Sequence, residues 1–193
     1  MERMGMRGLV VALVATVLAI APSVAFSQSS AGETTRDGQH DFDWMHGTWK
    51  ATLKRLVKPL TGSTTWVEYE GTQVTKPVWG GKANFDEFVA DSTDGSKVHL
   101  EGLTLRLYDP TTHQWSIYWA NAKSGLAMPP TVGHWTNGRG EFYDTEEFNG
   151  KPIVVRYVWS DITATSGHFE QSFSADGGKT WEVNWISTIT RVK

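Results

Sequence analysis

Apolar and polar residues alternate in short runs from Thr48 to the end of the chain. In the first run Trp49, Ala51 and Leu53 fall on one face of an extended segment, because successive side chains of a strand point to opposite faces. Residues typical of turns, mainly glycine, proline, asparagine and aspartate, separate each run from the next. The pattern predicts about ten strands, at residues 48–55, 66–75, 83–90, 98–108, 114–121, 131–135, 141–148, 153–162, 167–174 and 180–192.

No helix of convincing length interrupts these strands, so the predicted fold class is all-β. Roughly 10–12 residues separate the start of one strand from the next, and Asn149-Gly150 is a strong signal for a tight hairpin. Sequential hairpins predict a single antiparallel up-and-down barrel, and a β-sandwich is the alternative. A barrel of about ten strands is wide enough to hold one small ligand.

Gly102 interrupts the longest of the predicted strands. Val98 and Leu100 share one parity before it, whereas Leu103 and Leu105 take the other parity after it. A glycine at a change of parity is typical of a β-bulge, because the extra residue turns the following side chains to the other face. We therefore predict a bulge at Gly102.

The N-terminus has the features of an export signal. Two arginines precede an apolar run at residues 9–21, which is shorter than the roughly 20 residues of a membrane span. Small residues follow, and we expect cleavage after Ala25 or, as the alternative, after Ser27. No second apolar run follows, which argues against a residual membrane anchor. A periplasmic or secreted protein is therefore expected.

Three segments are predicted on this basis: a signal peptide at 1–25, a flexible leader at 26–39 and the β-barrel domain at 40–193. The leader is rich in small polar residues and lacks apolar periodicity, so it has no face to bury.

Charge and cysteine content exclude several function classes. The formal net charge of −3 becomes −4 when Glu2, Arg3 and Arg7 leave with the signal peptide. The chain has no basic stripe, so nucleic acid is not an expected partner. It also has no cysteine, which excludes disulfides, thiolate chemistry and the lipid attachment of a bacterial lipoprotein.

Gly47-Thr48-Trp49 at the start of the first strand resembles the opening of lipocalins and related calycin barrels. In that family the tryptophan closes one end of the barrel. Further segments extend the likeness over residues 40–193. These segments are 40–44, 105–110, 156–161, 170–174, 176–182 and 184–185, and the single residues Trp115 and Trp119 belong with them. Together they resemble an exported bacterial domain-of-unknown-function family (fifteen seventy-nine) with a lipocalin-like barrel. The resemblance implies a calycin-like fold and export, and it implies no particular activity.

Nitrobindin-like haem barrels also open with Gly-Thr-Trp, and they resemble this chain to that extent. They bind haem through a histidine near their C-terminal end. The last predicted strand here has no histidine between Trp185 and Arg191, so we predict no haem and no other cofactor.

Ten tryptophans are many for a chain of 193 residues. Large aromatic side chains can fill the interior of a barrel completely. They can equally line a ligand cavity, whose walls are also aromatic. The sequence leaves both interpretations open.

Residues 174–181 match the Asp-box pattern of sialidase propellers, Ser-x-Asp-x-Gly-x-Thr-Trp. A propeller repeats this motif, whereas this chain contains it once and is too short for a propeller. We therefore expect a structural turn in which Asp176 accepts hydrogen bonds from turn amides.

His40, Asp41, Asp43 and His46 form the densest cluster of possible metal ligands. Imidazole and carboxylate would suit zinc, but the spacing matches no standard zinc motif. The same segment contains Phe42 and Trp44, whose aromatic side chains would plug the barrel mouth. We favour the plug and predict no metal site. No Gly-x-Ser-x-Gly elbow or phosphate loop supports a catalytic motif.

Two arginines stand among apolar strand residues. Arg106 lies between leucines, and Arg156 lies between valines and Tyr157. Both could be solvated residues of the outer face. Alternatively they enter the barrel and bind a carboxylate or similar anion, because the planar guanidinium donates two parallel hydrogen bonds. Glu170 would then be a charge partner or a general acid/base.

The inward alternative defines a predicted ligand-binding set of charged, polar and aromatic residues. Its members are Arg106, Tyr118, Trp119, Arg156, Trp159, Glu170, Asn184 and Trp185.

Three functions fit these observations. The first is binding of a small hydrophobic or anionic ligand inside the barrel. The second is an enzyme on the same barrel, an isomerase, cyclase or hydrolase that uses Glu170, an arginine and a histidine. The third is a structural or interaction domain with a packed interior. An open cavity would favour the first two, and a titratable pair inside it would favour the second.

Overall fold

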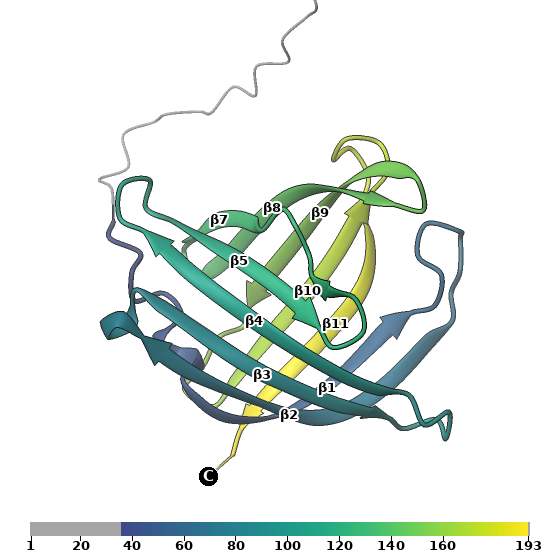
Figure 1. Ribbon diagram of the computed structural model, residues 1–193, viewed down its shortest axis with the longest axis horizontal. Coiled ribbons are helices and arrows are strands. Elements are labelled where there is room, and N and C mark those ends of the chain that lie inside the picture. The colour runs from purple at the N-terminus through teal and green to yellow at the C-terminus, as the bar shows by residue number, and fades with distance from the viewer. Residues whose placement is uncertain (1–35, 193) are drawn as a thin grey trace, which may run out of the picture. The chain divides into compact units, whose positions relative to one another are not determined.

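Ten antiparallel strands close into a barrel in the computed structural model, which describes residues 36–192 (Figure 1). The predicted signal peptide and most of the predicted leader fall outside the described residues. The ten strands of the barrel are β1 (Gly47–Leu56), β2 (Trp66–Val78), β3 (Ala83–Ser92), β4 (His99–Asp109), β5 (Gln114–Asn121), β7 (Thr131–Thr136), β8 (Arg139–Phe148), β9 (Lys151–Ser160), β10 (Ser166–Ser174) and β11 (Glu182–Arg191). A two-residue strand, β6 (Gly125–Leu126), pairs with β5 alone.

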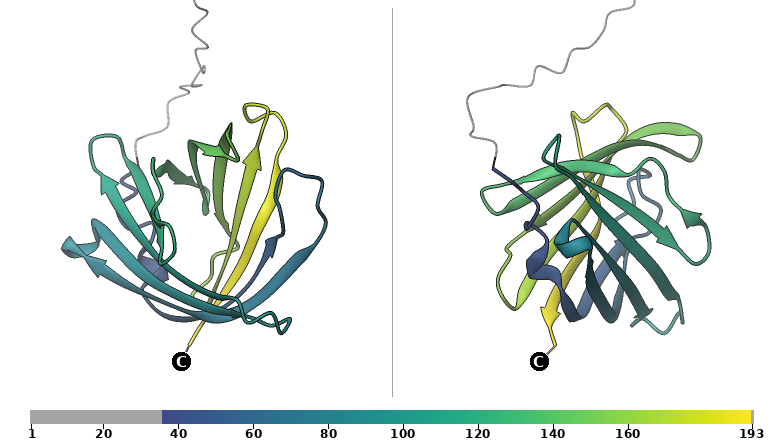
Figure 2. Two further views of the ribbon diagram at one scale, coloured as in Figure 1. Left: turned by 45° about the vertical axis from the view of Figure 1, so that its right-hand side comes forward. Right: turned by 60° about the vertical axis from the view of Figure 1, so that its left-hand side comes forward.

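Each barrel strand pairs with its neighbour in sequence, and β11 pairs back onto β1 to complete the circle. The predicted all-β, up-and-down, calycin-like barrel is confirmed, and the strands wrap round one interior in both views of Figure 2. The helical content of the described residues is two short 3₁₀ helices, η1 (Asp43–Met45) and η2 (Trp79–Gly81). Within residues 36–192 no helix has the length and apolar character needed to span a membrane.

The seam between β5 and β7 is the least extensive of the barrel. Three residue pairs join these strands, from Trp115 with Gly133 to Ile117 with Thr131. In contrast, eight pairs join β4 to β5. The chain between β5 and β7 carries β6, and Ala127 beyond it donates its amide to the Trp119 carbonyl at 2.8 Å.

The segment before β1 closes one end of the barrel. Phe42 is fully buried and meets Trp115 and Trp135 edge to face, with ring centroids 5.1 and 5.2 Å apart. Trp49 is also fully buried and donates its indole N–H to the Met45 carbonyl at 2.6 Å. Edge-to-face contacts suit the aromatic quadrupole and leave little free space. The predicted aromatic plug is confirmed.

Arg191 fastens this plug from the last strand. Its Nη2 donates to the Trp44 carbonyl at 2.6 Å, and its Nη1 donates to the His46 carbonyl at 2.8 Å. The guanidinium also lies 4.1 Å from the centre of the Trp49 ring, a favourable cation–π geometry.

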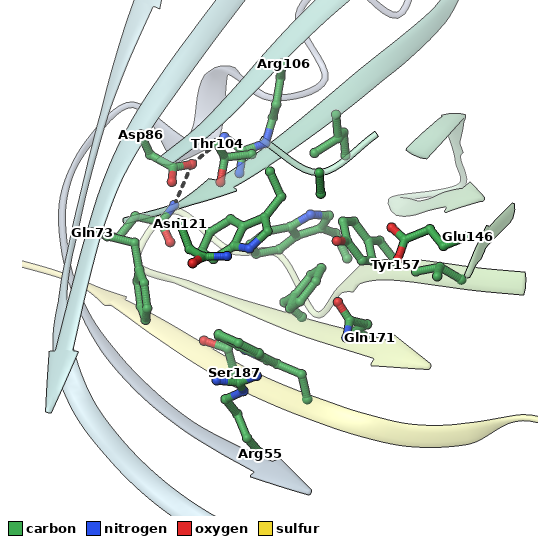
Figure 3. A pocket seen from close by; sticks show the side chains of 18 of the residues that line it. Arg55, Gln73, Asp86, Thr104, Arg106, Asn121, Glu146, Tyr157, Gln171 and Ser187 are labelled. Carbon is green, nitrogen blue, oxygen red and sulfur yellow. Dashed lines mark hydrogen bonds and ion pairs between the residues drawn. The ribbon is translucent and has the colours of Figure 1, made fainter. Parts of the chain in front are cut away.

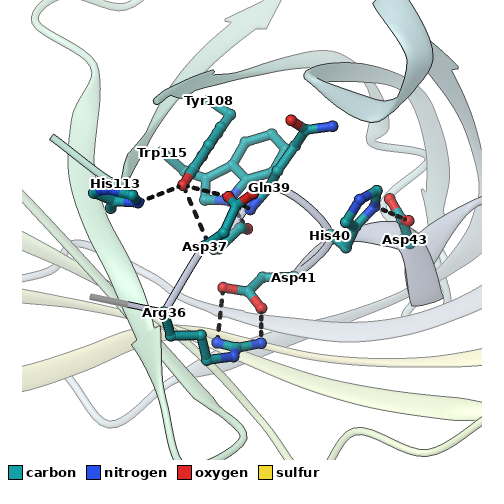
Figure 4. Close-up of polar contacts among 10 residues, drawn as sticks. Arg36, Asp37, Gln39, His40, Asp41, Asp43, Tyr108, His113 and Trp115 are labelled. Carbon is teal, nitrogen blue, oxygen red and sulfur yellow. Dashed lines mark hydrogen bonds and ion pairs between the residues drawn. The ribbon is translucent and has the colours of Figure 1, made fainter. Parts of the chain in front are cut away.

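A second set of hydrogen bonds holds the residues just before the plug (Figure 4). The Tyr108 hydroxyl donates to Asp37 Oδ1 at 2.8 Å and accepts from the Gly38 amide at 3.1 Å. Trp115 donates its indole N–H to the Gly38 carbonyl at 2.9 Å. Asp37 and Gly38 belong to the predicted leader, yet they contact the barrel.

The predicted bulge at Gly102 is wrong. The pairing of β4 with β3 runs through Gly102 without a shift, and Phe88 lies opposite the glycine. A Cβ atom at this position would lie 2.0 Å from Cη2 of Trp119, so the glycine makes room for the indole ring. The register shift lies instead between Gln171 and Ser172, where β10 pairs with β11.

Candidate functional site

The barrel interior contains an open cavity of about 400 Å³ (Figure 3), and Arg106 in its wall contacts Phe42 of the plug. This volume lies within the range of small-molecule sites. Eight of the twenty residues that line the cavity are aromatic, and they are Phe88, Trp119, Phe148, Tyr157, Trp159, Phe169, Phe173 and Trp185.

Three of these rings form a connected cluster. The centroids of Phe88, Trp119 and Trp185 are 6.2 to 6.4 Å apart in each pair, and the rings are tilted or edge to face. They come from β3, β5 and β11, so the cluster joins strands that are far apart in sequence. A flat apolar ligand could stack on these faces.

Arg106 lies at the floor of the cavity. It projects inward from β4, is 3% exposed, and its guanidinium lies 5.2 Å from the ring centre of Phe42 in the plug. Its Nη1 donates to Asp86 Oδ2 at 2.5 Å and to Asn84 Oδ1 at 3.0 Å. Gln73 Nε2 donates to the same Asp86 oxygen at 3.3 Å, so the charges are paired within a polar network.

Nη1 is the only nitrogen of Arg106 that donates a hydrogen bond within the described residues. Its Nε is buried and has no hydrogen-bond partner among the described residues. Buried donors are almost always paired in folded proteins. Arg156 Nε on the outer face also has no partner among the described residues, so what points to a ligand or water at Arg106 is the cavity that this residue lines. A guanidinium donor favours a carboxylate or another anion.

Arg55 marks the rim of the cavity. Its side chain is exposed, and its guanidinium lies 4.8 Å from the ring centre of Trp185. The contact places a second positive charge where a ligand would enter, and the ring holds the long side chain against the wall.

Two carboxyl groups face the interior from β8. The side chains at 142, 144, 146 and 148 share one face of this strand; Phe142 is fully buried, and Glu146 lines the cavity. Burial and then the neighbouring Glu146 raise the pKa of Asp144 to about 7. Burial also raises the pKa of Glu146. Tyr157, on the adjacent β9, faces both carboxyls, and burial raises the pKa of its hydroxyl.

Four of the eight predicted ligand-binding residues line the cavity: Arg106, Trp119, Trp159 and Trp185. The remaining four do not, and their positions correct the prediction.

Arg156 and Tyr118 point away from the interior. The guanidinium of Arg156 lies 4.4 Å from the ring centre of Trp181, which belongs to the β10–β11 hairpin. Its neighbours Val155 and Tyr157 take the inward positions of β9. Tyr118 pairs with Leu105 of β4 on the outer side, since Trp119 next to it faces inward.

Glu170 also lies on the outer face, because Phe169 and Gln171 on either side of it line the cavity. Its Oε1 is 3.1 Å from Nε2 of His168, a local surface contact. Asn184 is buried beside the cavity without lining it. Its Oδ1 accepts a hydrogen bond from Gln171 Nε2 at 2.7 Å, so it positions a lining residue.

Sequence reasoning missed the polar lining residues Gln73, Asp86, Asn121 and Gln171 and the carboxyl pair on β8. The alternation of side chains along β8 could have predicted the inward direction of the carboxyl pair. Once Phe142 is assigned inward, Asp144 and Glu146 must share its face, because the side-chain period of a strand is two.

The cluster before β1 does not assemble as a metal site. His40 Nδ1 lies 2.8 Å from Asp43 Oδ2, whereas Asp41 forms an ion pair with Arg36. Among residues 36–192 no three or more histidine, cysteine, aspartate or glutamate side chains come together as metal ligands. The Asp-box segment is a structural turn, as expected, since Asp176 Oδ1 accepts from the amides of Lys179 and Thr180.

Two solved structures share this fold. The S-type phycobiliprotein lyase CPES from Guillardia theta is 11% identical, with a TM-score of 0.56, and the alignment covers 82% of this chain and 94% of the lyase. Rv2717c from M. tuberculosis is 12% identical, with a TM-score of 0.56, and 82% and 99% of the two chains are covered. These likenesses support the calycin-like fold alone, because the identities are so low. No protein-family model matches the sequence, and no curated protein matches it.

Proposed function

We propose that the protein binds a small ligand that has an aromatic or other flat apolar body and an anionic group. The observation that carries the proposal is the cavity of about 400 Å³ whose aromatic wall surrounds a buried arginine with an unpaired N–H. In this arrangement the body of the ligand stacks on the rings, and its anionic group accepts from the guanidinium of Arg106.

The other two functions find less support. A packed interaction domain would fill its interior, whereas this barrel leaves a ligand-sized space. The enzyme built on Glu170 lacks that acid/base inside the cavity, since the residue is on the outer face. The carboxyl pair on β8 does face the interior, so an enzyme that uses Asp144 or Glu146 as its acid/base is the second candidate function. A protein of the same fold is named a lyase, so the fold itself does not decide between binding and catalysis.

Two naphthalene probes of the same shape test the proposal. They are 6-(hydroxymethyl)-2-naphthoate and its neutral carboxamide, 6-(hydroxymethyl)-2-naphthamide. Isothermal titration calorimetry of the purified protein should give roughly tenfold tighter binding of the carboxylate, the gain of one charge-assisted hydrogen bond.

Two arginines of the chain provide the matched variants. Arg106→Gln should remove the preference for the carboxylate, and Arg156→Ala should keep it, because Arg156 lies outside the barrel. Arg106→Lys retains a positive charge beside Asp86 and covers the case in which the glutamine variant does not fold. Equal binding of both probes by the unchanged protein, or equal losses in the Arg106 and Arg156 variants, would contradict the proposal.

The proposed place of action is the periplasm or the medium outside the cell. This part rests on the N-terminal sequence alone, and a size difference between precursor and exported protein in cell fractions would test it. Membership of the exported family with the lipocalin-like barrel likewise remains a prediction from sequence.

A further inference from the structure

The carboxyl pair of Asp144 and Glu146 lies in the same barrel interior as Arg106 but on another part of the wall. In the sheet, Arg106 pairs with Ile117, and Ile117 pairs with Thr131. Val132 pairs with Tyr143, so the same register brings Thr131 beside Asp144. Arg106 and Asp144 thus belong to one row of neighbouring residues across the sheet, three strands apart, which is roughly 14 Å along the wall.

The view into the cavity agrees with this separation. Glu146 and Tyr157 lie on the opposite side of Figure 3 from Asp86 and Gln73, which belong to the network of Arg106. The interior therefore has a guanidinium region and a carboxyl region, with aromatic rings between them.

Two polar atoms beside the pair have no partner among the described residues. They are Oδ1 of Asp144 and Oγ1 of Thr131, both buried, and Thr131 is 1% exposed. Both oxygens can accept a hydrogen bond. This region can therefore accept hydrogen bonds from a ligand, whereas Arg106 Nε can donate one.

Both carboxyls belong to the inward face of β8, two residues apart. Burial and then the neighbouring carboxyl of Glu146 raise the pKa of Asp144 to about 7, so Asp144 holds a proton at slightly acidic pH. Around the pair, β9 contributes Tyr157 and β7 contributes the uncharged Thr131.

The charged groups elsewhere in the cavity wall are Arg55, Arg106 and Asp86. Asp86 and Arg106 neutralise each other, and Arg55 is exposed at the rim. None of these groups supplies a direct counterion to the carboxyl pair in the described structure, since no ion pair to either carboxyl is formed there.

We propose that Asp144 and Glu146 form a second subsite of the cavity that binds a protonated amine, so that the ligand is an aromatic zwitterion with its charges at opposite ends. This inference rests on the proposed function, because it assigns the second end of the same ligand. An ammonium group donates three hydrogen bonds, which suits the two carboxyls and Thr131 Oγ1.

Binding has a defined proton balance. The ammonium group keeps its own protons, and the proton held by Asp144 leaves to solvent because the ligand's positive charge favours the ionised carboxylate. No covalent bond forms or breaks. Uptake of an amine by this subsite therefore releases up to about one proton per ligand, and binding tightens as pH rises through the titration of the pair.

A matched probe pair isolates the subsite. 6-(Aminomethyl)-2-naphthoate differs from 6-(hydroxymethyl)-2-naphthoate in the charge of one end. By calorimetry at pH 6.5, the amine should bind roughly tenfold tighter, the gain of a charge-assisted contact. Titrations in two buffers of different ionisation enthalpy should show proton release for the amine and none for the alcohol.

Three carboxyl-to-amide variants on β8 complete the test. Asp144→Asn and Glu146→Gln should each abolish the amine preference and the proton release, and either one suffices if the other does not fold. Glu147→Gln is the control, since Glu147 is exposed on the outer face of the same strand. It should retain both effects.

The outcomes separate the inference from the proposed function. If the alcohol binds and depends on Arg106 while the amine gains nothing, this inference is wrong and the anion site stands. If Glu147→Gln weakens amine binding as much as Asp144→Asn, the subsite is also wrong. If none of the naphthalene probes binds, the proposed function fails together with it.

Discussion

The closed end of the barrel and the cavity beyond it use the same residue types in different ways. At the closed end Arg191 donates from Nη1, Nη2 and Nε to the carbonyls of His46, Trp44 and Ala164. In the cavity Arg106 donates from Nη1, and its Nε is buried without a partner among the described residues. All three nitrogens of Arg191 thus donate within the fold, whereas of the three nitrogens of Arg106 only Nη1 does so among the described residues.

The aromatic residues differ in a parallel way. Phe42 is enclosed by rings on several sides and has no exposed surface. Phe173 packs on Phe148 at 5.3 Å and otherwise faces the cavity. The same side-chain chemistry therefore stabilises the fold at one end and shapes a binding surface at the other.

The largest expected effect compares these two phenylalanines. Phe42→Ala should destabilise the protein by about 3–5 kcal/mol, because it opens a new cavity in a packed cluster. Phe173→Ala should cost about 1–2 kcal/mol, because it enlarges a space that already exists. Urea denaturation would measure both, and equal losses would contradict the contrast between a packed end and an open cavity.

Gly102→Ala should act on the cavity wall itself. The new methyl group would meet the Trp119 ring, so the ring must shift at a cost of about 1–3 kcal/mol. Near-ultraviolet circular dichroism should report the displaced indole, and probe binding should weaken. Leu103→Ala is the control, because this side chain is 46% exposed on the outer face. An unchanged spectrum in the Gly102 variant would contradict the prediction, because it would mean that the Trp119 ring does not move.

Asp144→Asn should make stability less sensitive to pH. The pKa of Asp144 in the folded protein is about 7, above its ordinary value of 3.8. Between these values the folded state binds more protons than the unfolded state, so stability falls as pH rises from about 4 to 7. The variant should be more stable than the parent by about 1–2 kcal/mol at pH 8, a value reduced for the partial exposure of the carboxyl.

The same comparison at pH 3.5 serves as its internal control, since the carboxyl is then protonated in the folded state and mostly protonated in the unfolded state. The difference between variant and parent should therefore nearly vanish there. A difference that stays constant from pH 3.5 to pH 8 would mean that Asp144 does not carry the raised pKa.

Arg156→Ala should have the smallest effect. Loss of its contact with Trp181 should cost about 0.5–1 kcal/mol, the low end for a cation–π pair, because the guanidinium is only partly buried. A double-mutant cycle with Trp181→Ala would isolate this interaction energy. Affinity for the naphthoate probe should not change, and a loss of affinity would place Arg156 in the binding site after all.

The sequence predicted the barrel well because alternation and turn residues are local signals. The hairpin at Asn149-Gly150 and the aromatic plug around Phe42 follow from such signals. The faces of β4 were harder to assign. Leu103, Leu105 and Leu107 point outward there, while Thr104 and Arg106 point inward.

The usual expectation that apolar residues face inward failed on β4 because the interior is itself polar at that level. Arg106 and Arg156 stand in similar sequence surroundings, yet they take opposite faces. On β9 the expectation held, since Val155 and Tyr157 do face the interior. The hydrogen bond of Arg106 with Asp86 joins residues that are 20 apart in the chain. A local sequence pattern therefore could not predict that Arg106 has this partner inside the barrel.

The short seam between β5 and β7 bears on how fast a guest can leave. Three residue pairs hold it, so parting these strands breaks fewer backbone hydrogen bonds than parting β4 from β5. Local opening needs less free energy than global unfolding where few bonds must break. We therefore expect ligand residence time to be governed by this seam, and the amides of β7 to exchange with deuterium earlier than those of β4.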